Sequence, residues 1–218
     1  MKNKLVIFDM DGVLLDTEII SDACWKQTFE DKGLEFSKKQ RRSLIGKSIA
    51  ETKELFIRTF NKDVFDEVHD YWLALFTKHI DELGVDAKEG VIDFITFLKA
   101  RKIHVAVASS THSYKAIPLL KRVGLYDLLD YHMFGDMVEV TKPNPEIYNR
   151  VVEYFGIDKR DALIFEDSLA GVEAANNANI DVVWIEDLAD LNDEKHLKYV
   201  MSTSSIEKSF SVLSSLII

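Results

Sequence analysis

The chain has 218 residues, of which 47% are apolar and 29% charged, enough for one domain with a large core or for a core with a small accessory domain. Its net charge of −10 argues against a nucleic-acid-binding protein, because such proteins normally carry a basic stripe. A single cysteine, Cys24, excludes an intramolecular disulfide and any metal site made of cysteines alone.

The first predicted element is a strand at residues 5–8, a continuous apolar run. Asp9 and Asp11 follow it, and their side chains should project to the same side because residues i and i+2 of an extended chain share a face. Gly12 permits a sharp turn after them. The pair is either an ordinary Asp/Gly turn or part of a site, and its position at the carboxyl end of a strand favours a site.

Residues 16–83 contain helical patterns and no run typical of a strand. The predicted helices span residues 16–32, 51–60 and 64–79. The segment leaves the sheet at the carboxyl end of the first strand, so a helical domain here would cover a site at that edge as a lid. We therefore expect an α/β core domain of residues 1–15 and 84–218 and a helical cap domain of residues 16–83.

After the cap, residues 91–101 have helical spacing and residues 103–108 form the second predicted strand. This strand ends in Ser109, Ser110 and Thr111, and another helix follows. Small hydroxyls and free backbone N–H groups at a helix N-terminus make a natural phosphate cradle. An ordinary N-cap is the alternative.

The following helix is predicted at residues 112–123, with a kink or a restart at Pro118 because proline has no backbone N–H. Residues 131–134 are a weaker strand candidate. Lys142 then precedes a helix that should begin at Asn144-Pro145 and end at Gly156. The helix dipole disfavours a cation there, so Lys142 either pairs with carboxylates and phosphoryl oxygens or is a solvated loop lysine.

The fourth predicted strand, residues 162–165, leads into a second acidic pair, Glu166 and Asp167. Four carboxylates at one edge of a sheet would raise one another's pKa values unless a cation joined them. They are hard oxygen ligands with no His or Cys beside them, which suits Mg²⁺ rather than zinc. The alternative is that Glu166 or Asp167 merely caps the next helix.

A helix at residues 171–178 and a strand at residues 182–185 complete the predicted core. Strands that are apolar on both faces suit a parallel sheet covered by helices. We therefore predict an α/β fold, a doubly wound and mostly parallel Rossmann-like sheet with an inserted helical cap.

Together these features fit phosphoryl transfer, which needs positive charge around the equatorial oxygens and an in-line nucleophile. Mg²⁺ and Lys142 would supply the charge. One aspartate can attack to form an aspartyl phosphate, and the other can protonate the leaving alcohol and then activate water.

This pattern resembles the four motifs of the haloacid dehalogenase superfamily, which lie here at residues 9–13, Ser109, Lys142-Pro143 and Glu166-Asp167. The likeness extends through residues 14–18 and 166–175, which look like the β-phosphoglucomutase-like branch with its helical cap. It covers essentially the whole chain, and four motifs in order are highly specific.

The resemblance implies that Asp9 is the nucleophile and Asp11 the general acid and base. The second aspartate argues against the dehalogenase branch, which lacks it. The implied Mg²⁺ ligands are Asp9, the main-chain carbonyl of Asp11, and Asp167, with Glu166 in support. The expected phosphate-binding residues are Ser109 and Lys142, together with Ser110 of the predicted cradle.

Two departures from the family pattern bear on the reaction. Sugar-phosphate mutases of this branch carry a histidine four residues before a tryptophan in the first cap helix, and here Ser21 precedes Trp25. They also carry an arginine a few residues after a glycine of the cap, and here Gly46 is followed by Lys47 and the arginine position is Ile49. Both departures favour hydrolysis, and Lys47 either contacts a substrate anion or belongs to a solvated basic face.

We therefore predict a Mg²⁺-dependent phosphatase of a small phosphorylated metabolite, a sugar phosphate in particular. The alternatives are a β-phosphoglucomutase-type mutase and a non-catalytic binding protein on the same fold. No secretory signal precedes Asp9, and no apolar run reaches the roughly 18 residues of a membrane span. We expect a cytoplasmic monomer with no membrane or nucleic-acid partner.

Overall fold

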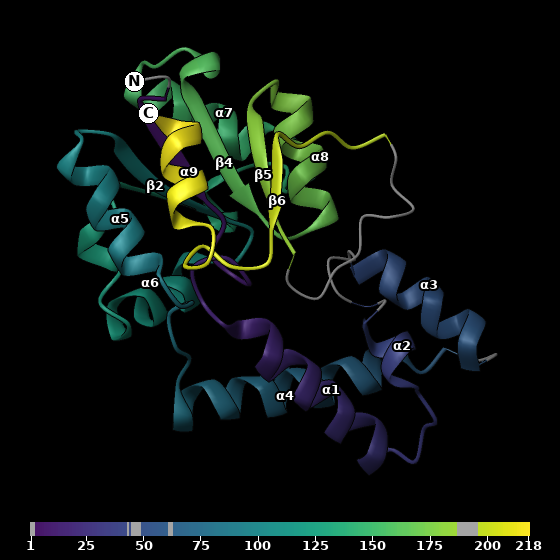
Figure 1. Cartoon of the computed structure of the whole chain (residues 1–218). Coiled ribbons are helices and arrows are strands. Elements are labelled where there is room, and N and C mark those ends of the chain that lie inside the picture. Colours follow the sequence, from purple (N-terminus) through teal and green to yellow (C-terminus); the bar gives the residue numbers. More distant parts are fainter. Residues whose placement is uncertain (1–2, 43, 45–48, 61–62, 187–195) are drawn as a thin grey trace.

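The computed structural model describes residues 3–42, 44, 49–60, 63–186 and 196–218, without the side chains of residues 39, 42 and 49–51. Within this part of the chain, six parallel strands form one sheet in the order β3-β2-β1-β4-β5-β6 (Figure 1). The strands are β1 (Leu5–Phe8), β2 (His104–Ser109), β3 (Tyr131–Phe134), β4 (Ala162–Glu166), β5 (Asp181–Ile185) and β6 (Met201–Thr203). The predicted doubly wound α/β fold is confirmed.

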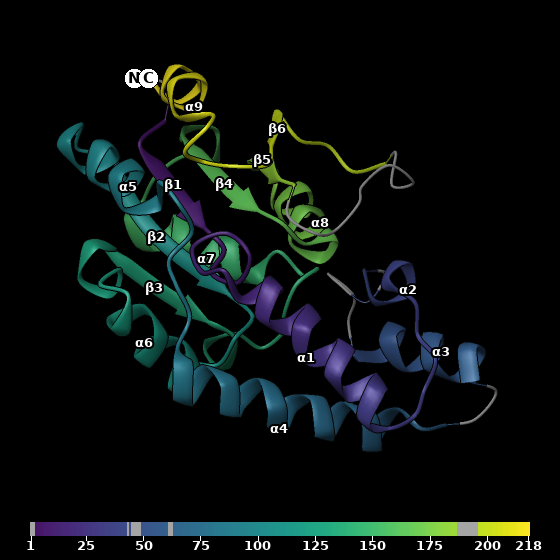
Figure 2. The same cartoon turned by 60° about the horizontal axis from the view of Figure 1, so that its bottom comes forward.

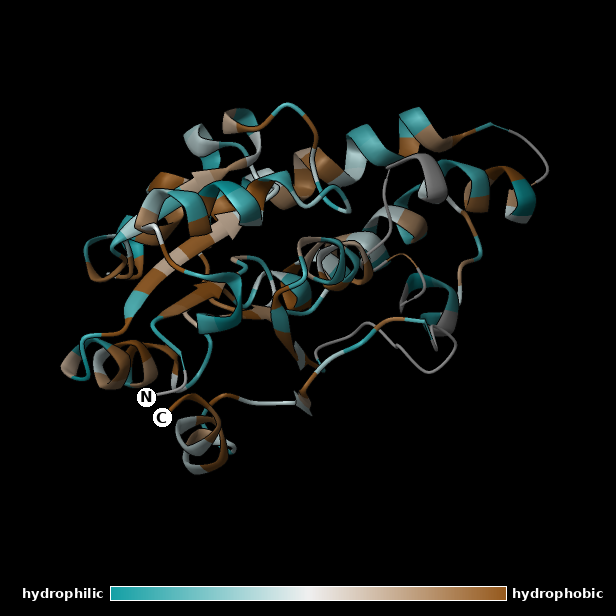
Figure 3. Cartoon of the chain, turned by 90° about the horizontal axis from the view of Figure 1, so that it is seen from above, coloured by the Kyte–Doolittle hydropathy of each residue, from teal (hydrophilic) through white to brown (hydrophobic). Residues whose placement is uncertain are grey.

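Helices cover both faces of the sheet because the strands carry apolar residues on both faces. Leu5 and Ile7 of β1 pack with α7 (Glu146–Phe155) and α8 (Leu169–Ala178). Val6 and Phe8 face the opposite side. That side is covered by α5 (Val91–Ala100), α6 (Ser113–Arg122) and α9 (Phe210–Ile217). Hydrophobic colour is concentrated on the strands between the two helical layers (Figure 3).

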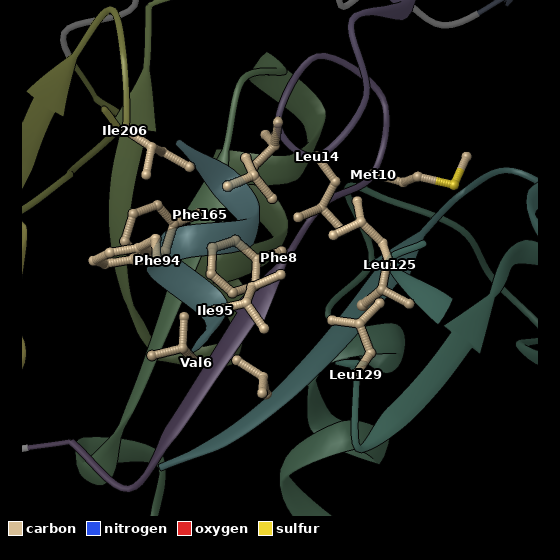
Figure 4. Packing of buried hydrophobic residues seen from close by; sticks show 14 of the residues in the cluster. Val6, Phe8, Met10, Leu14, Phe94, Ile95, Leu125, Leu129, Phe165 and Ile206 are labelled. Carbon is tan, nitrogen blue, oxygen red and sulfur yellow. The ribbon is translucent and has the colours of Figure 1, made fainter. Parts of the chain in front are cut away.

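Aromatic rings fill the centre of the core on the α5 side of the sheet (Figure 4). The ring of Phe8 lies 5.0 Å from that of Phe165 and 6.4 Å from that of Phe94, measured between centroids. All three side chains are fully buried. This packing fixes the end of β1, and the residue that follows Phe8 is Asp9.

Four helices lie together beyond the carboxyl ends of the strands, toward which the strand arrowheads point (Figure 2). They are α1 (Thr17–Asp31), α2 (Lys38–Arg42), α3 (Ile49–Phe60) and α4 (Phe65–Leu83). All four fall within the predicted cap, residues 16–83, and we call this segment the cap from here on. The division into two domains stays a prediction. No helix among the described residues is long and apolar enough to cross a bilayer.

Four details differ from the sequence-based expectations. The short elements α2 and β6 and the C-terminal helix α9 were not predicted. The helix α9 forms where Leu213 and Ile217 are buried in the core, a partner surface that its own sequence does not reveal. Of the kink or restart expected at Pro118, the restart is wrong, because α6 continues through it, and the kink stays a prediction. The carbonyl that loses its i+4 donor belongs to Tyr114, which is exposed.

The cap has a hydrophobic cluster of its own, centred on Phe56 of α3, which is fully buried. The Phe56 ring lies within 6 Å of the rings of Trp25, Phe29, Phe36, Phe60 and Phe65. This cluster does not include residues of the sheet, so the cap should respond to its own core mutations.

We expect Phe56→Ala to lower the free energy of unfolding of the cap by about 3–5 kcal/mol, because it removes a buried aromatic ring and leaves a cavity. The neighbouring Ile57 is 43% exposed, so Ile57→Ala is the matched control and should cost about 1 kcal/mol or less. Urea unfolding followed by near-ultraviolet circular dichroism measures both. Equal losses in the free energy of unfolding for the two variants would contradict the packing described above.

Candidate active site

The predicted site residues meet at the carboxyl edge of the sheet, beside the cap. Phe8 of β1 is in register with Val107 of β2 and Phe165 of β4, so the residues that follow these strands are neighbours. The backbone N–H of Asp9 donates to the Phe165 carbonyl at 2.9 Å. Side chains that are buried at this edge are those of Asp9, Ser109, Glu166 and Asp167.

Lys142 lies at the centre of this group. Its ammonium donates to Asp9 Oδ1 at 2.5 Å, to Glu166 Oε1 at 2.6 Å and to the Ala108 carbonyl at 3.0 Å. The side chain is only 4% exposed, so the alternative of a solvated loop lysine is wrong. The loop therefore brings one positive charge between two carboxylates.

The loop that carries Lys142 is held by the start of α7. The Glu146 carboxylate accepts hydrogen bonds from the backbone N–H groups of Glu139 and Val140 at 3.0 Å. The side chain of Asn144 accepts from the N–H of Glu146, the first residue of α7, at 2.9 Å. These bonds explain how an exposed loop can deliver a buried lysine at a defined position.

The site holds more carboxylate than ammonium. Burial, opposed by Lys142 and assisted by Glu166 and Asp11, raises the pKa of Asp9 to about 8. Burial alone would lower the pKa of Lys142, but Asp9 and Glu166 raise it well above its usual value. Lys142 is therefore charged, and another cation would favour the ionised form of Asp9.

Glu166 is fixed by protein donors on both of its oxygens. Oε1 accepts from Lys142 and from the Tyr148 hydroxyl at 2.9 Å, and Oε2 accepts from the Ser168 N–H at 2.9 Å and its hydroxyl at 3.0 Å. A Cβ at Gly171 would lie 1.7 Å from Oε1, so only glycine leaves room for this carboxylate. Glu166 is thus held as the partner of Lys142.

Sequence reasoning missed Tyr148. It lies on the buried face of α7 and is fully buried, so its spacing marks it as a core residue. The signal that could have found it is the hydroxyl itself, because a buried tyrosine usually needs a hydrogen-bond partner. That partner is Glu166.

The three hydroxyl residues after β2 occupy different places. Ser109 is buried in the site, and its hydroxyl accepts from the Thr111 N–H at 3.0 Å. Ser110 is exposed. Thr111 donates its hydroxyl to Asp11 Oδ2 at 2.7 Å. Burial raises the pKa of Asp11, and this hydrogen bond opposes the rise. Thr111 therefore contacts the second aspartate, a role that sequence reasoning did not assign to it.

The donors present fit a magnesium ion better than a metal with four side-chain ligands. Among the described residues, no three His, Cys, Asp or Glu side chains are placed to hold a metal ion between them. Glu166 is held by Lys142, Tyr148 and Ser168, whereas Asp9 and Asp167 are the buried aspartates that follow β1 and β4. A Cβ at Gly12 would lie 1.9 Å from Asp167 Oδ2, so this turn packs directly against Asp167. Mg²⁺ commonly takes one or two carboxylates and completes its shell with substrate phosphate and water.

The cap residues that separate hydrolysis from mutase activity are only partly described. The Ser21 carbonyl accepts from the Trp72 indole N–H at 3.3 Å, and Trp72 stacks on Trp25 with 4.8 Å between centroids. Ser21 is the position at which the family resemblance leads us to expect histidine in a mutase, and this assignment stays a prediction. Gly46, Lys47 and Ser48, as well as the side chain of Ile49, lie outside the described residues.

The sequence matches a known family over most of its length. The family of haloacid dehalogenase-like hydrolases matches residues 6–185. The curated phosphorylated carbohydrates phosphatase of Thermotoga maritima is 33% identical over 197 residues, which cover 88% of this chain and 88% of that protein.

Solved structures show the same fold. A structure from Thermotoga maritima, described as that of a candidate β-phosphoglucomutase, is 30% identical with a TM-score of 0.75, and the match covers 97% of this chain and 99% of that one. The β-phosphoglucomutase of Clostridium difficile is 22% identical with a TM-score of 0.74, covering 98% and 96%. At this lower identity the likeness concerns the fold alone.

Proposed function

The chain belongs to the haloacid dehalogenase-like hydrolases, and from that premise we propose that it hydrolyses a small phosphorylated metabolite, a sugar phosphate, through an aspartyl phosphate. The observation that carries this proposal is the buried Lys142 ammonium between Asp9 and Glu166. Lys142 places a positive charge beside the Asp9 carboxylate at the carboxyl edge of the sheet, near the second aspartate, Asp11. The phosphatase from Thermotoga maritima supports the substrate class.

The reaction has two balanced steps. Asp9 attacks phosphorus, an Oδ–P bond forms, and the bond from phosphorus to the leaving oxygen breaks while the Asp11 carboxyl gives its proton to that oxygen. Asp11 then takes a proton from water, whose oxygen attacks phosphorus, and the bond to Asp9 breaks to release inorganic phosphate. Lys142 offsets negative charge on the phosphoryl oxygens in both steps. The raised pKa of Asp11 supports its role as proton donor.

We also propose that the enzyme depends on magnesium. Asp9, Asp167 and the main-chain carbonyl of Asp11 would hold the ion, and its charge would stabilise the phosphoryl oxygens during transfer. Ser109 and Lys142 would bind the phosphate, with the backbone of Ser110 beside them. The predicted monomeric state and cytoplasmic location stay predictions.

Release of inorganic phosphate from a set of phosphorylated metabolites, with Mg²⁺ present, tests this function. Glucose 1-phosphate with a trace of bisphosphate separates the alternatives, because glucose 6-phosphate as product indicates a mutase and free phosphate indicates a phosphatase. Ser21 in place of histidine favours free phosphate. Magnesium binding without turnover of any phosphate ester would instead indicate a non-catalytic binding protein.

We expect Asp11→Asn to lower kcat for a sugar phosphate by about 10²–10⁴-fold, the usual contribution of general acid–base catalysis. The amide keeps the shape of the side chain but cannot give or take the proton. Asp181→Asn is the control, because Asp181 is exposed at the amino end of β5. Steady-state phosphate release measures both variants. A kcat for Asp11→Asn within about threefold of the wild-type value would remove Asp11 from this role.

A further inference from the structure

We propose that Thr111 is a positioning residue for Asp11, holding the carboxyl group so that it delivers its proton to the leaving oxygen. This inference rests on the proposed function and deepens it. Thr111 Oγ1 lies 2.7 Å from Asp11 Oδ2, although 100 residues separate the two in sequence. Thr111 acts through Asp11 and needs no contact with the substrate.

The backbone of Thr111 is fixed on both sides. Its N–H donates to the Ser109 hydroxyl at 3.0 Å, and its carbonyl accepts from the Gly135 N–H at 3.1 Å. Ser109 is the last residue of β2 and is almost fully buried. With both of its peptide groups bonded in this way, Thr111 presents its hydroxyl from a defined place.

The residues that follow β3 hold the segment around Thr111 in position. A Cβ at Gly135 would lie 2.1 Å from the Ser110 carbonyl oxygen, so the two loops approach more closely than any other residue would allow. The adjacent Asp136 carboxylate accepts from the Ser113 N–H and hydroxyl, each at 2.6 Å. Residues on both sides of Thr111 are therefore tied to the end of β3.

The hydrogen bond also restricts the orientation of the Asp11 carboxyl group. The Thr111 hydroxyl holds Oδ2 at 2.7 Å, so Oδ1 is the oxygen that can turn toward a leaving group. Thr17 supplies a second hydroxyl beside this carboxyl group, so loss of the Thr111 hydroxyl loosens the orientation of Asp11 without releasing it.

The alternative role of Thr111 is direct binding of the phosphate, as the cradle pattern after β2 suggests. The two roles predict different dependence on the leaving group. A phosphate ligand matters equally for every phosphate monoester. A residue that positions the general acid matters most for esters whose leaving oxygen needs a proton and least for those that leave as stable anions.

The test compares Thr111→Val, which removes the hydroxyl at nearly constant shape, with Thr111→Ser, which keeps it. Thr96→Val is the control, because Thr96 lies exposed on α5 and donates to the Ile92 carbonyl of its own helix. The probes are p-nitrophenyl phosphate, phenyl phosphate and glucose 6-phosphate, whose leaving groups need a proton to an increasing degree. The quantity compared is kcat/KM, which covers the steps up to departure of the leaving group.

For Thr111→Val we expect a loss in kcat/KM of less than about threefold with p-nitrophenyl phosphate and of about 10–100-fold with glucose 6-phosphate, part of the usual general-acid contribution. Phenyl phosphate should fall between them. Thr111→Ser should restore all three values to within about threefold of the wild type, and Thr96→Val should match the wild type throughout.

Equal losses with all three probes, or no loss with any, would overturn the positioning role. If Thr111→Val does not fold, the same comparison is made with Thr111→Ala. Wild-type rates are measured first, and absence of hydrolysis of every phosphate ester would overturn the proposed function and this inference together. A wild type that is active while Thr111→Val shows no leaving-group dependence would overturn only the inference.

Discussion

Asp9→Asn is expected to lower kcat by about 10⁴-fold or more, the scale seen when an enzyme loses its nucleophile. An amide oxygen is a much poorer nucleophile than a carboxylate, so no aspartyl phosphate can form. The substitution preserves the size of the side chain at a buried position. It also removes one of the two carboxylates that bind Lys142, but Glu166 still holds the ammonium.

Single-turnover assays of phosphate release measure this loss, and mass spectrometry of acid-quenched protein detects the phosphorylated aspartate in the wild type. Asp93→Asn is the matched control, because Asp93 is exposed on α5, and it should behave as the wild type. Hydrolysis by Asp9→Asn within about tenfold of the wild-type rate would exclude Asp9 as the nucleophile.

Removal of magnesium should have the second large effect. We expect excess EDTA to lower phosphate release by about 10³-fold, because a metal ion contributes several kcal/mol of charge stabilisation in phosphoryl transfer. The structure supports this expectation because Lys142 contacts both Asp9 and Glu166, while Asp11 raises the pKa of Asp9 and Asp167 packs against Gly12. Burial keeps the pKa of Asp9 raised in spite of the lysine.

EDTA saturated beforehand with Mg²⁺ is the control and should leave the rate unchanged. Added Mg²⁺ should restore activity to the chelated enzyme, and calorimetry should detect Mg²⁺ binding that Asp167→Asn weakens. Full activity in excess EDTA would rule out the metal requirement.

Much of the fold could be predicted because most of its strands are marked by a run of apolar residues that are neighbours in the sequence. The run at residues 5–8 is apolar at every position, and the structure places β1 at those residues with alternate side chains on two faces. Short elements were not predicted because their own residues carry no such apolar run. The strand β6 has three residues, two of them polar, and exists because β5 provides its hydrogen-bond partners.

Those residues of the candidate site that lie at the ends of strands could be predicted from the sequence. Asp9, Ser109 and Glu166 stand at or after the ends of β1, β2 and β4, and parallel strands bring such positions to one edge. Tyr148 escaped because it lies in the middle of a helix, where a buried aromatic residue is ordinarily core.

Most of the strands and helices, and the chemical types gathered at one edge of the sheet, follow from the sequence, because apolar periodicity and strand ends are properties of neighbouring residues. Which side chains meet depends on the tertiary structure. Lys142 lies between Asp9 and Glu166, and Thr111 rather than Ser110 contacts Asp11. The contacts of Lys142 and Thr111 with the two aspartates join residues 100 or more positions apart. Such contacts depend on the packing of loops against one another, as at Gly135, and no local pattern specifies them.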